Sequence, residues 1–145
     1  MINTVQHKRY KPKFDKLFLW ILIPTALLMT GVTVVSALFD AVTLFFTVPV
    51  TLFVFYFLIT PVFGYAELRE SALFVKFGFF LAREIPYEKI RGVQKTRKFY
   101  SDSMLSLKNS LDHVNVKYNK FDILSVSVTD NEDFMAELEK RIKSL

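Results

Sequence analysis

Apolar positions are distributed so unevenly that they divide the chain into two parts. Residues 17–39 and 41–66 contain no charged side chain, and a single charge, Asp40, separates the two runs. As an α-helix that rises about 1.5 Å per residue, each run is long enough to cross a hydrocarbon core of roughly 30 Å, whereas one continuous helix would be about twice too long. We therefore predict two transmembrane helices, residues 17–39 and 41–64, that form an antiparallel hairpin.

Asp40 admits two interpretations. A charge between two apolar runs is typical of a turn that reaches water, but carboxylates inside a membrane also serve as proton or ion sites. The second role needs a partner base within the spans, and neither span contains one. We therefore predict that Asp40 forms the turn between the helices.

A cleaved signal peptide is an alternative explanation for the first apolar run. The basic start, the apolar stretch and the sequence "VSA" at residues 35–37 have the outline of such a segment. The run is longer than a typical signal core, however, and a second apolar run follows immediately. Retention as the first transmembrane helix is the interpretation that we favour.

Positive charge is concentrated before the first span. The net charge is +5, and residues 65–145 carry fourteen bases against twelve acids, so they are nearly neutral. Residues 1–16 form a basic arm with one acid and five bases, namely Lys8, Arg9, Lys11, Lys13 and Lys16. The hairpin turn contains no base, so the positive-inside rule predicts a multi-pass protein of the cell membrane with both termini in the cytoplasm. The five bases are candidate contacts for anionic lipid headgroups.

After residue 64 the pattern changes to short alternating runs, which are typical of β-strands. In "ALFVKF" the side chains of Leu73, Val75 and Phe77 share one face, Gly78 supplies a turn, and "LAREI" returns as a strand that Pro86 ends. Further strands are predicted at "IRGVQKT" and "SMLSL". Phe79 and Phe80 form an apolar turn for which three roles remain open: entering the membrane, contacting a partner, or closing the domain core.

The clearest hairpin and a final helix complete the chain. "HVNVKY" and "FDILSVSV" alternate around the turn "NK", with Val114, Val116 and Tyr118 on one face. In the last segment, "TDNEDFMAELEKRIKSL", Thr129 or Asp130 is placed to cap a helix. Apolar residues then recur at helical spacing, so we expect this helix to pack over the open sheet.

Three stretches together resemble the YyaB-like bacterial pleckstrin-homology-like (PH-like) domain family. They are "FVKFGFFLAREIPYEKIRGVQK", "SLDHVNVKYNKFD" and "VSVTDNEDFMAEL", and the resemblance covers residues 65–140. It implies an α+β membrane protein in which the helical hairpin precedes a cytoplasmic PH-like domain at residues 65–145. That domain would be a β-sandwich or partly open barrel with a C-terminal helix.

Two residues depart from the family pattern. His113 stands where the family often has arginine, and Val128 stands where it often has proline. We expect His113 to be a surface or edge residue of the hairpin rather than a metal ligand. We expect Val128 to let the last strand run one residue further.

No motif for catalysis, cofactor binding or metal binding is recognisable in the sequence. Cysteine is absent, and there is no histidine pair at ligand spacing, no Gly-rich phosphate loop and no GxSxG elbow. The acids of "DNED", residues 130–133, fit a helix cap better than a calcium loop. Glu84 and Glu88 flank Pro86 on a turn that we expect to be exposed, and no further group converges on them.

A basic stretch, "KIRGVQKTRK" at residues 89–98, has three interpretations: a solvated surface, contact with anionic lipid, or nucleic-acid binding. We favour the solvated surface and predict no nucleic-acid partner, because the domain is nearly neutral and tethered to a membrane. The function expected is therefore a noncatalytic, membrane-anchored binding or adaptor module that contacts a protein partner or itself. The resemblance also implies an alternative, a self-protection (immunity) protein against a membrane-active peptide.

Overall fold

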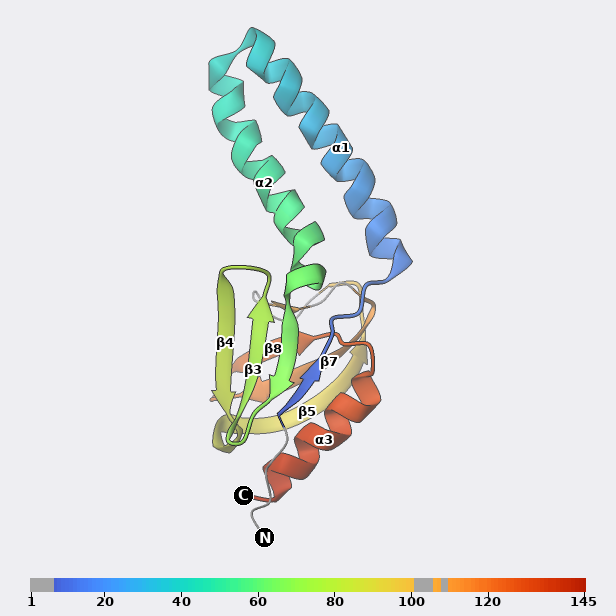
Figure 1. Cartoon of the computed structure of the whole chain (residues 1–145), viewed down its shortest axis with the longest axis vertical. Helices are drawn as coiled ribbons and strands as arrows, with labels where there is room; N and C mark the ends of the chain where they lie inside the picture. Colours follow the sequence, from blue (N-terminus) through green and yellow to red (C-terminus); the bar gives the residue numbers. More distant parts are fainter. Residues whose placement is uncertain (1–6, 101–105, 108–109) are drawn as a thin grey trace.

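The protein consists of a long helical hairpin and a β-rich domain (Figure 1). The computed structural model describes residues 7–100, 106–107 and 110–145. Helices α1 (Lys16–Phe39) and α2 (Ala41–Phe63) lie side by side and project from one end of the domain, and the C-terminus lies at its opposite end. Both helices are long and apolar enough to cross a membrane, and few of their residues are buried within the protein.

The two helices are joined through a single residue, Asp40. Its carboxylate accepts hydrogen bonds from the backbone N–H of Val42 at 2.9 Å and of Thr43 at 3.3 Å, and also from the Thr43 hydroxyl. These bonds, led by that of the hydroxyl, lower the pKa of Asp40. Asp40 therefore caps the start of α2, as a residue in a turn does. Its predicted place in the turn of the hairpin is confirmed.

Polar side chains join the helices along their contact. The hydroxyls of Thr33 in α1 and Thr51 in α2 lie 2.9 Å apart, and the Thr51 hydroxyl also donates to the carbonyl of Met29 at 3.3 Å. Hydrogen bonds between apolar helices contribute about 1 kcal/mol each. They orient the two helices relative to one another.

The described residues of the domain form two four-stranded sheets. The first is antiparallel and has the order β1 (Lys8–Tyr10), β2 (Tyr65–Leu68), β3 (Ala72–Phe77), β4 (Leu81–Pro86). The short 3-10 helix η1 (Tyr87–Lys89) leads into the second sheet, which has the order β5 (Ile90–Arg97), β7 (Asp112–Tyr118), β8 (Asp122–Val126), β6 (Ser106–Leu107). Helix α3 (Asn131–Lys143) packs against β5, β7 and η1. This confirms an α+β domain in which a C-terminal helix follows the sheets.

The faces predicted to be apolar form the core. Leu73, Val75 and Phe77 of β3 are buried, as are Val114 and Val116 of β7. β8 and α3 add Leu124, Val126, Phe134 and Leu138, and further core residues come from the other elements of the domain. Helix α3 thus covers the sheet with its predicted apolar stripe, and the Asp130 carboxylate caps it by accepting the N–H of Asp133 at 3.0 Å.

The last strand differs from the prediction. β8 ends at Val126, and Val128 instead forms an isolated bridge with Pro12. The expected extension of the strand toward Thr129 is therefore wrong, because a segment from before the first helix pairs with this end of the chain. Of the predicted strand "SMLSL", residues 106–107 form β6, and residues 103–105 lie outside the described residues.

This N-terminal segment, residues 7–15, is built into the domain. β1 pairs with β2 so that Tyr10 lies opposite Ala66. Beyond β1, the N–H of Lys13 donates to Ser127 at 3.1 Å, and the N–H of Thr129 donates to Lys11 at 3.0 Å. The segment thereby connects the edge of the first sheet to the end of β8. The helical hairpin is inserted between two strands that are neighbours in one sheet.

Candidate functional site

The five bases proposed to contact lipid are spread over different surroundings. Lys8 and Arg9 belong to β1, which runs from the far end of the domain toward the hairpin. Arg9 lies over the Tyr65 ring at 4.1 Å and pairs with Glu67 at 3.7 Å. Lys13 lies 4.0 Å from Asp112, whereas Lys11 and Lys16 are exposed. Of the five, Lys13 and Lys16 are nearest in sequence to the start of α1.

Lys8 joins a contact between β1 and the beginning of α3. The Asp133 carboxylate accepts hydrogen bonds from the Lys8 ammonium at 2.5 Å and from the Tyr10 hydroxyl at 2.7 Å, while the Tyr10 ring meets Phe134 edge-on at 5.2 Å. The bond from Lys8 lowers the pKa of Asp133 and raises that of Lys8. Burial, with the bond to Asp133, raises the pKa of Tyr10 from 10 to about 12. The contact therefore stabilises the arm on α3 near neutral pH.

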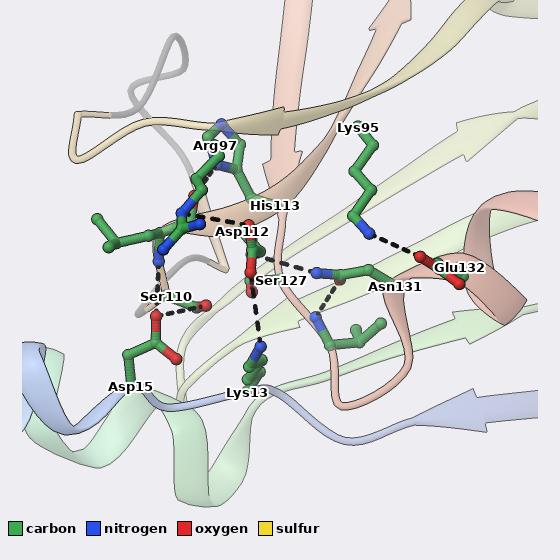
Figure 2. Close-up of polar contacts among 12 residues, drawn as sticks. Lys13, Asp15, Lys95, Arg97, Ser110, Asp112, His113, Ser127, Asn131 and Glu132 are labelled. Carbon is green, nitrogen blue, oxygen red and sulfur yellow. Dashed lines mark hydrogen bonds and ion pairs between the residues drawn. The ribbon is translucent and has the colours of Figure 1, made fainter.

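A second polar cluster fastens the arm next to the base of α1 (Figure 2). The Asp15 carboxylate accepts from the Ser110 hydroxyl at 2.8 Å and from the N–H of Leu111 at 2.9 Å. The Asp112 carboxylate lies between Lys13 at 4.0 Å and Arg97 at 3.8 Å. Each of these contacts joins residues that are far apart in the sequence. Together they fix the point where the chain leaves the domain to form the hairpin.

The same cluster continues into the turn before α3. The Asn131 side chain accepts from the N–H of Val128 at 2.9 Å and donates to the Asp112 carbonyl at 3.2 Å. That carbonyl also accepts from the Ser127 hydroxyl at 2.7 Å. The Asn131 side chain, the Ser127 hydroxyl and the Asp112 carbonyl therefore all have hydrogen-bond partners within the protein. Their burial is explained by this structural role and does not indicate a binding site.

His113 is fully buried, so the expectation that it is a surface or edge residue is wrong. Its Nδ1 lies 3.0 Å from the Leu111 carbonyl. Asn115, Ser125 and Ser127, on the strand face that alternation assigns to solvent, are also buried, and the Ser125 hydroxyl donates to Asn115 at 2.7 Å. The second sheet is therefore covered on both faces, with an apolar side and a polar side.

The acidic residues considered for metal binding have structural partners. Asp130 caps α3, Asp133 binds Lys8 and Tyr10, and Glu132 pairs with Lys95 at 2.9 Å. Glu84 lies 3.5 Å from Arg69. Within the part of the chain that the structure describes, no three His, Asp or Glu side chains are grouped to hold a metal ion.

The basic stretch at residues 89–98 follows the edge strand β5. Lys95 and Arg97 pair with Glu132 and Asp112, so acidic partners offset part of its charge. Arg91 lies at the opposite end of the strand, where its guanidinium donates to the carbonyl of Lys120 at 3.4 Å. The stretch is therefore divided between two ends of the domain and does not form one continuous basic surface.

At the end where Arg91 lies, the structure contains a groove that the sequence did not indicate. The groove has a volume of about 270 Å³ and is lined by Arg91, Lys117, Tyr118, Asn119, Lys120, Phe121, Asp122 and Ile123. Three bases and one acid surround it, and the acid, Asp122, accepts from the Asn119 amide at 2.7 Å. We call this feature the distal groove. The distal groove lies at one end of β7 and the Asp112 cluster at the other. Because β7 has seven residues, the groove is about 20 Å from this cluster at the base of the hairpin.

Phe121 is the side chain that sequence reasoning missed. It occupies the turn between β7 and β8 and is 84% exposed. The signal was available in "NKFD", where a large apolar residue stands in a two-strand turn between charged neighbours. An exposed aromatic residue beside bases is typical of protein-binding surfaces.

Comparison with protein families identifies the domain. The family described as Bacterial PH domain matches residues 65–142, more than half of the chain, and the protein belongs to this family. No curated protein and no solved structure gives a match. The matched region begins at β2. β1 and the rest of the arm, which precede the hairpin in the sequence, lie outside it. PH-like domains generally bind other molecules rather than catalyse reactions.

The raised pKa of Tyr10 predicts a specific loss of stability in alkali. An unfolded tyrosine ionises near pH 10, whereas Tyr10 keeps its proton to about pH 12, so its contribution is present below pH 10 and lost as the pH rises to about 12. Tyr10→Phe keeps the ring contact and removes the hydrogen bond to Asp133, which costs about 1 kcal/mol at neutral pH. In thermal unfolding of the detergent-solubilised proteins, the difference in Tm between the native protein and the Tyr10→Phe variant is expected to be smaller at pH 12 than at pH 8. An equal difference at both pH values would contradict this assignment.

Proposed function

We propose that the protein is a noncatalytic binding module that the helical hairpin anchors in the cell membrane. The carrying observation is that two adjacent, almost wholly exposed apolar helices begin and end at neighbouring strands of one domain. Such a surface is unfavourable in water and matches a hydrocarbon environment. The family relationship supports binding as the activity of the domain.

The position of the bases supports a cytoplasmic domain. Lys16 begins α1, and Lys13 and Lys11 precede it, whereas the Asp40 turn carries no base. By the positive-inside rule this distribution supports a cytoplasmic position for the domain and both termini. We assign contact with anionic headgroups first to Lys11, Lys13 and Lys16. Lys8 and Arg9 contribute mainly through their contacts within the domain.

The distal groove is the surface that we assign to a protein partner. It lies at the end of β7 opposite the Asp112 cluster, which is next to the start of α1, so a membrane-anchored domain would present it to the cytoplasm. Its three bases suit an acidic segment, and the exposed Phe121 ring offers an apolar contact beside them. The protein would thus hold an acidic partner close to the membrane.

Single-cysteine labelling tests the anchoring directly, because the chain contains no cysteine. Phe39→Cys reports on the hairpin turn and Lys120→Cys on the distal groove, and both positions are exposed. A membrane-impermeant maleimide added to intact cells is expected to label Phe39→Cys alone. It should label Lys120→Cys only after the membrane is permeabilised. Labelling of Lys120→Cys in intact cells would contradict the proposed orientation.

Crosslinking in cells tests the partner surface. The full-length protein should capture a partner, and reversing two charges of the groove with Lys117→Glu and Lys120→Glu should reduce the capture at least about tenfold, as loss of a binding hot spot does. Lys140→Glu changes the same charge on the exposed side of α3 and serves as the matched control. Capture that is unaffected by the paired substitution, or that yields only a second copy of the chain, would refute the groove as a site for an acidic partner.

A further inference from the structure

The turn between β3 and β4 packs directly against α2. The Tyr56 hydroxyl of α2 donates a hydrogen bond to the Phe77 carbonyl, and the Phe63 ring lies 4.2 Å from the Phe79 ring. Gly78 between them has φ +67°, and a Cβ there would lie 3.0 Å from the Tyr56 ring. Glycine is therefore favoured both by the backbone conformation and by the close approach to the helix. Direct contacts therefore hold the turn against α2.

This turn presents apolar side chains to its surroundings. Phe80 is 87% exposed, and its neighbours Phe79 and Leu81 are 48% and 45% exposed. Of the three roles left open by the sequence, closure of the core is therefore wrong for Phe79 and Phe80. Consecutive exposed apolar residues are unusual at a turn in water and mark a surface that contacts another phase or molecule.

The position of the β3–β4 turn along the axis of α2 indicates what the turn contacts. Tyr56 lies seven residues before the end of α2, which corresponds to about 10 Å along the helix axis. The apolar stretch of α2 that is suited to a membrane runs to Thr60. A hydrogen bond from Tyr56 therefore holds the turn level with the last part of that stretch. When the helix spans the bilayer, the turn lies at the boundary between headgroups and hydrocarbon.

Aromatic residues occupy the corresponding place beside α1. Phe99 stacks on Phe18 with ring centroids 5.6 Å apart, and Tyr100, which follows it, is largely exposed. The Lys98 ammonium lies 5.3 Å from the centre of the Tyr100 ring. Aromatic rings and nearby bases of this kind are enriched where a membrane meets water. Both sides of the hairpin base thus carry exposed aromatic residues from the domain.

We propose that the turn between β3 and β4 is a third membrane contact, whose apolar side chains Phe79, Phe80 and the adjoining Leu81 insert into the interfacial region of the bilayer next to α2. This inference rests on the proposed anchoring by the hairpin and extends it to the domain. With the hairpin, the turn fixes the orientation of the domain. This contact would also fix the direction in which the distal groove faces.

Tryptophan fluorescence in lipid vesicles tests this contact. The only tryptophan, Trp20, is exposed on α1 and reports on the hairpin in the native protein. In a Trp20→Phe background, Phe80→Trp places the reporter in the turn, and Phe121→Trp places it in the distal groove as the matched control. Both replaced phenylalanines are highly exposed, so the core is unchanged, and Leu81→Trp gives a second reporter for the turn. The vesicles contain phosphatidylcholine and phosphatidylglycerol with or without brominated acyl chains.

Brominated lipid is expected to quench Trp20 in the native protein and the reporters in the Phe80→Trp and Leu81→Trp variants. The Phe121→Trp reporter should keep its full emission. If Trp20 is quenched while neither reporter in the turn loses emission, the inserted turn is refuted and the anchored hairpin stands. If Trp20 is not quenched, the anchoring itself fails, and the insertion of the turn fails with it.

Discussion

The architecture depends on the pairing of β1 with β2, two strands that lie on opposite sides of the helical hairpin in the sequence. Tyr10 lies opposite Ala66, so the chain leaves and re-enters the domain at neighbouring places. Hydrogen bonds from Ser110 and Leu111 to Asp15 hold the outgoing chain, and the hydrogen bond from the Tyr56 hydroxyl of α2 to the Phe77 carbonyl holds the returning helix. Because both ends of the hairpin are held, the domain does not hang from a flexible linker. Its position relative to the helices is part of the fold.

This attachment gives the domain two different ends. The side next to the hairpin carries aromatic turns and the polar cluster around Asp15 and Asp112, whereas the opposite end of β7 carries the distal groove with its bases and Phe121. The strands of the second sheet connect these ends and keep them about 20 Å apart. A binding module anchored in this way would present the same surface in every copy. Such fixed presentation lowers the entropic cost of capturing a partner near the membrane.

Local patterns were sufficient to predict most elements of the fold. The two charge-free runs became α1 and α2, alternation identified β3, β4, β5 and β7, and the cap at Asp130 marked the start of α3. Each of these signals lies within a few neighbouring residues. The resemblance in residues 65–140 then indicated the PH-like class, and the family match at residues 65–142 supports it at the level of a bacterial PH domain.

The contacts that tie the protein together were not predictable in this way. β1 contains only Lys8, Arg9 and Tyr10, and its charges suggested a membrane flank. Its pairing could not be read from local sequence, because its partner strand begins more than fifty residues later. Burial of His113 likewise depends on what covers the second face of the sheet, and period-two alternation carries no information about that cover. The distal groove arises where β5 meets the turn after β7. It exists only when the sheet has formed.

Hydrogen exchange of the full-length protein in lipid nanodiscs tests the central claim, that residues 7–15 are an integral part of the domain. The amides of Lys13 and Thr129 donate to Ser127 and Lys11, so their exchange should be slowed to an extent similar to that of amides in β7 and β8. Rapid, unprotected exchange at Lys13 and Thr129 beside a well-protected β7 and β8 would show that the arm is detached. The fixed coupling of hairpin and domain would then be wrong.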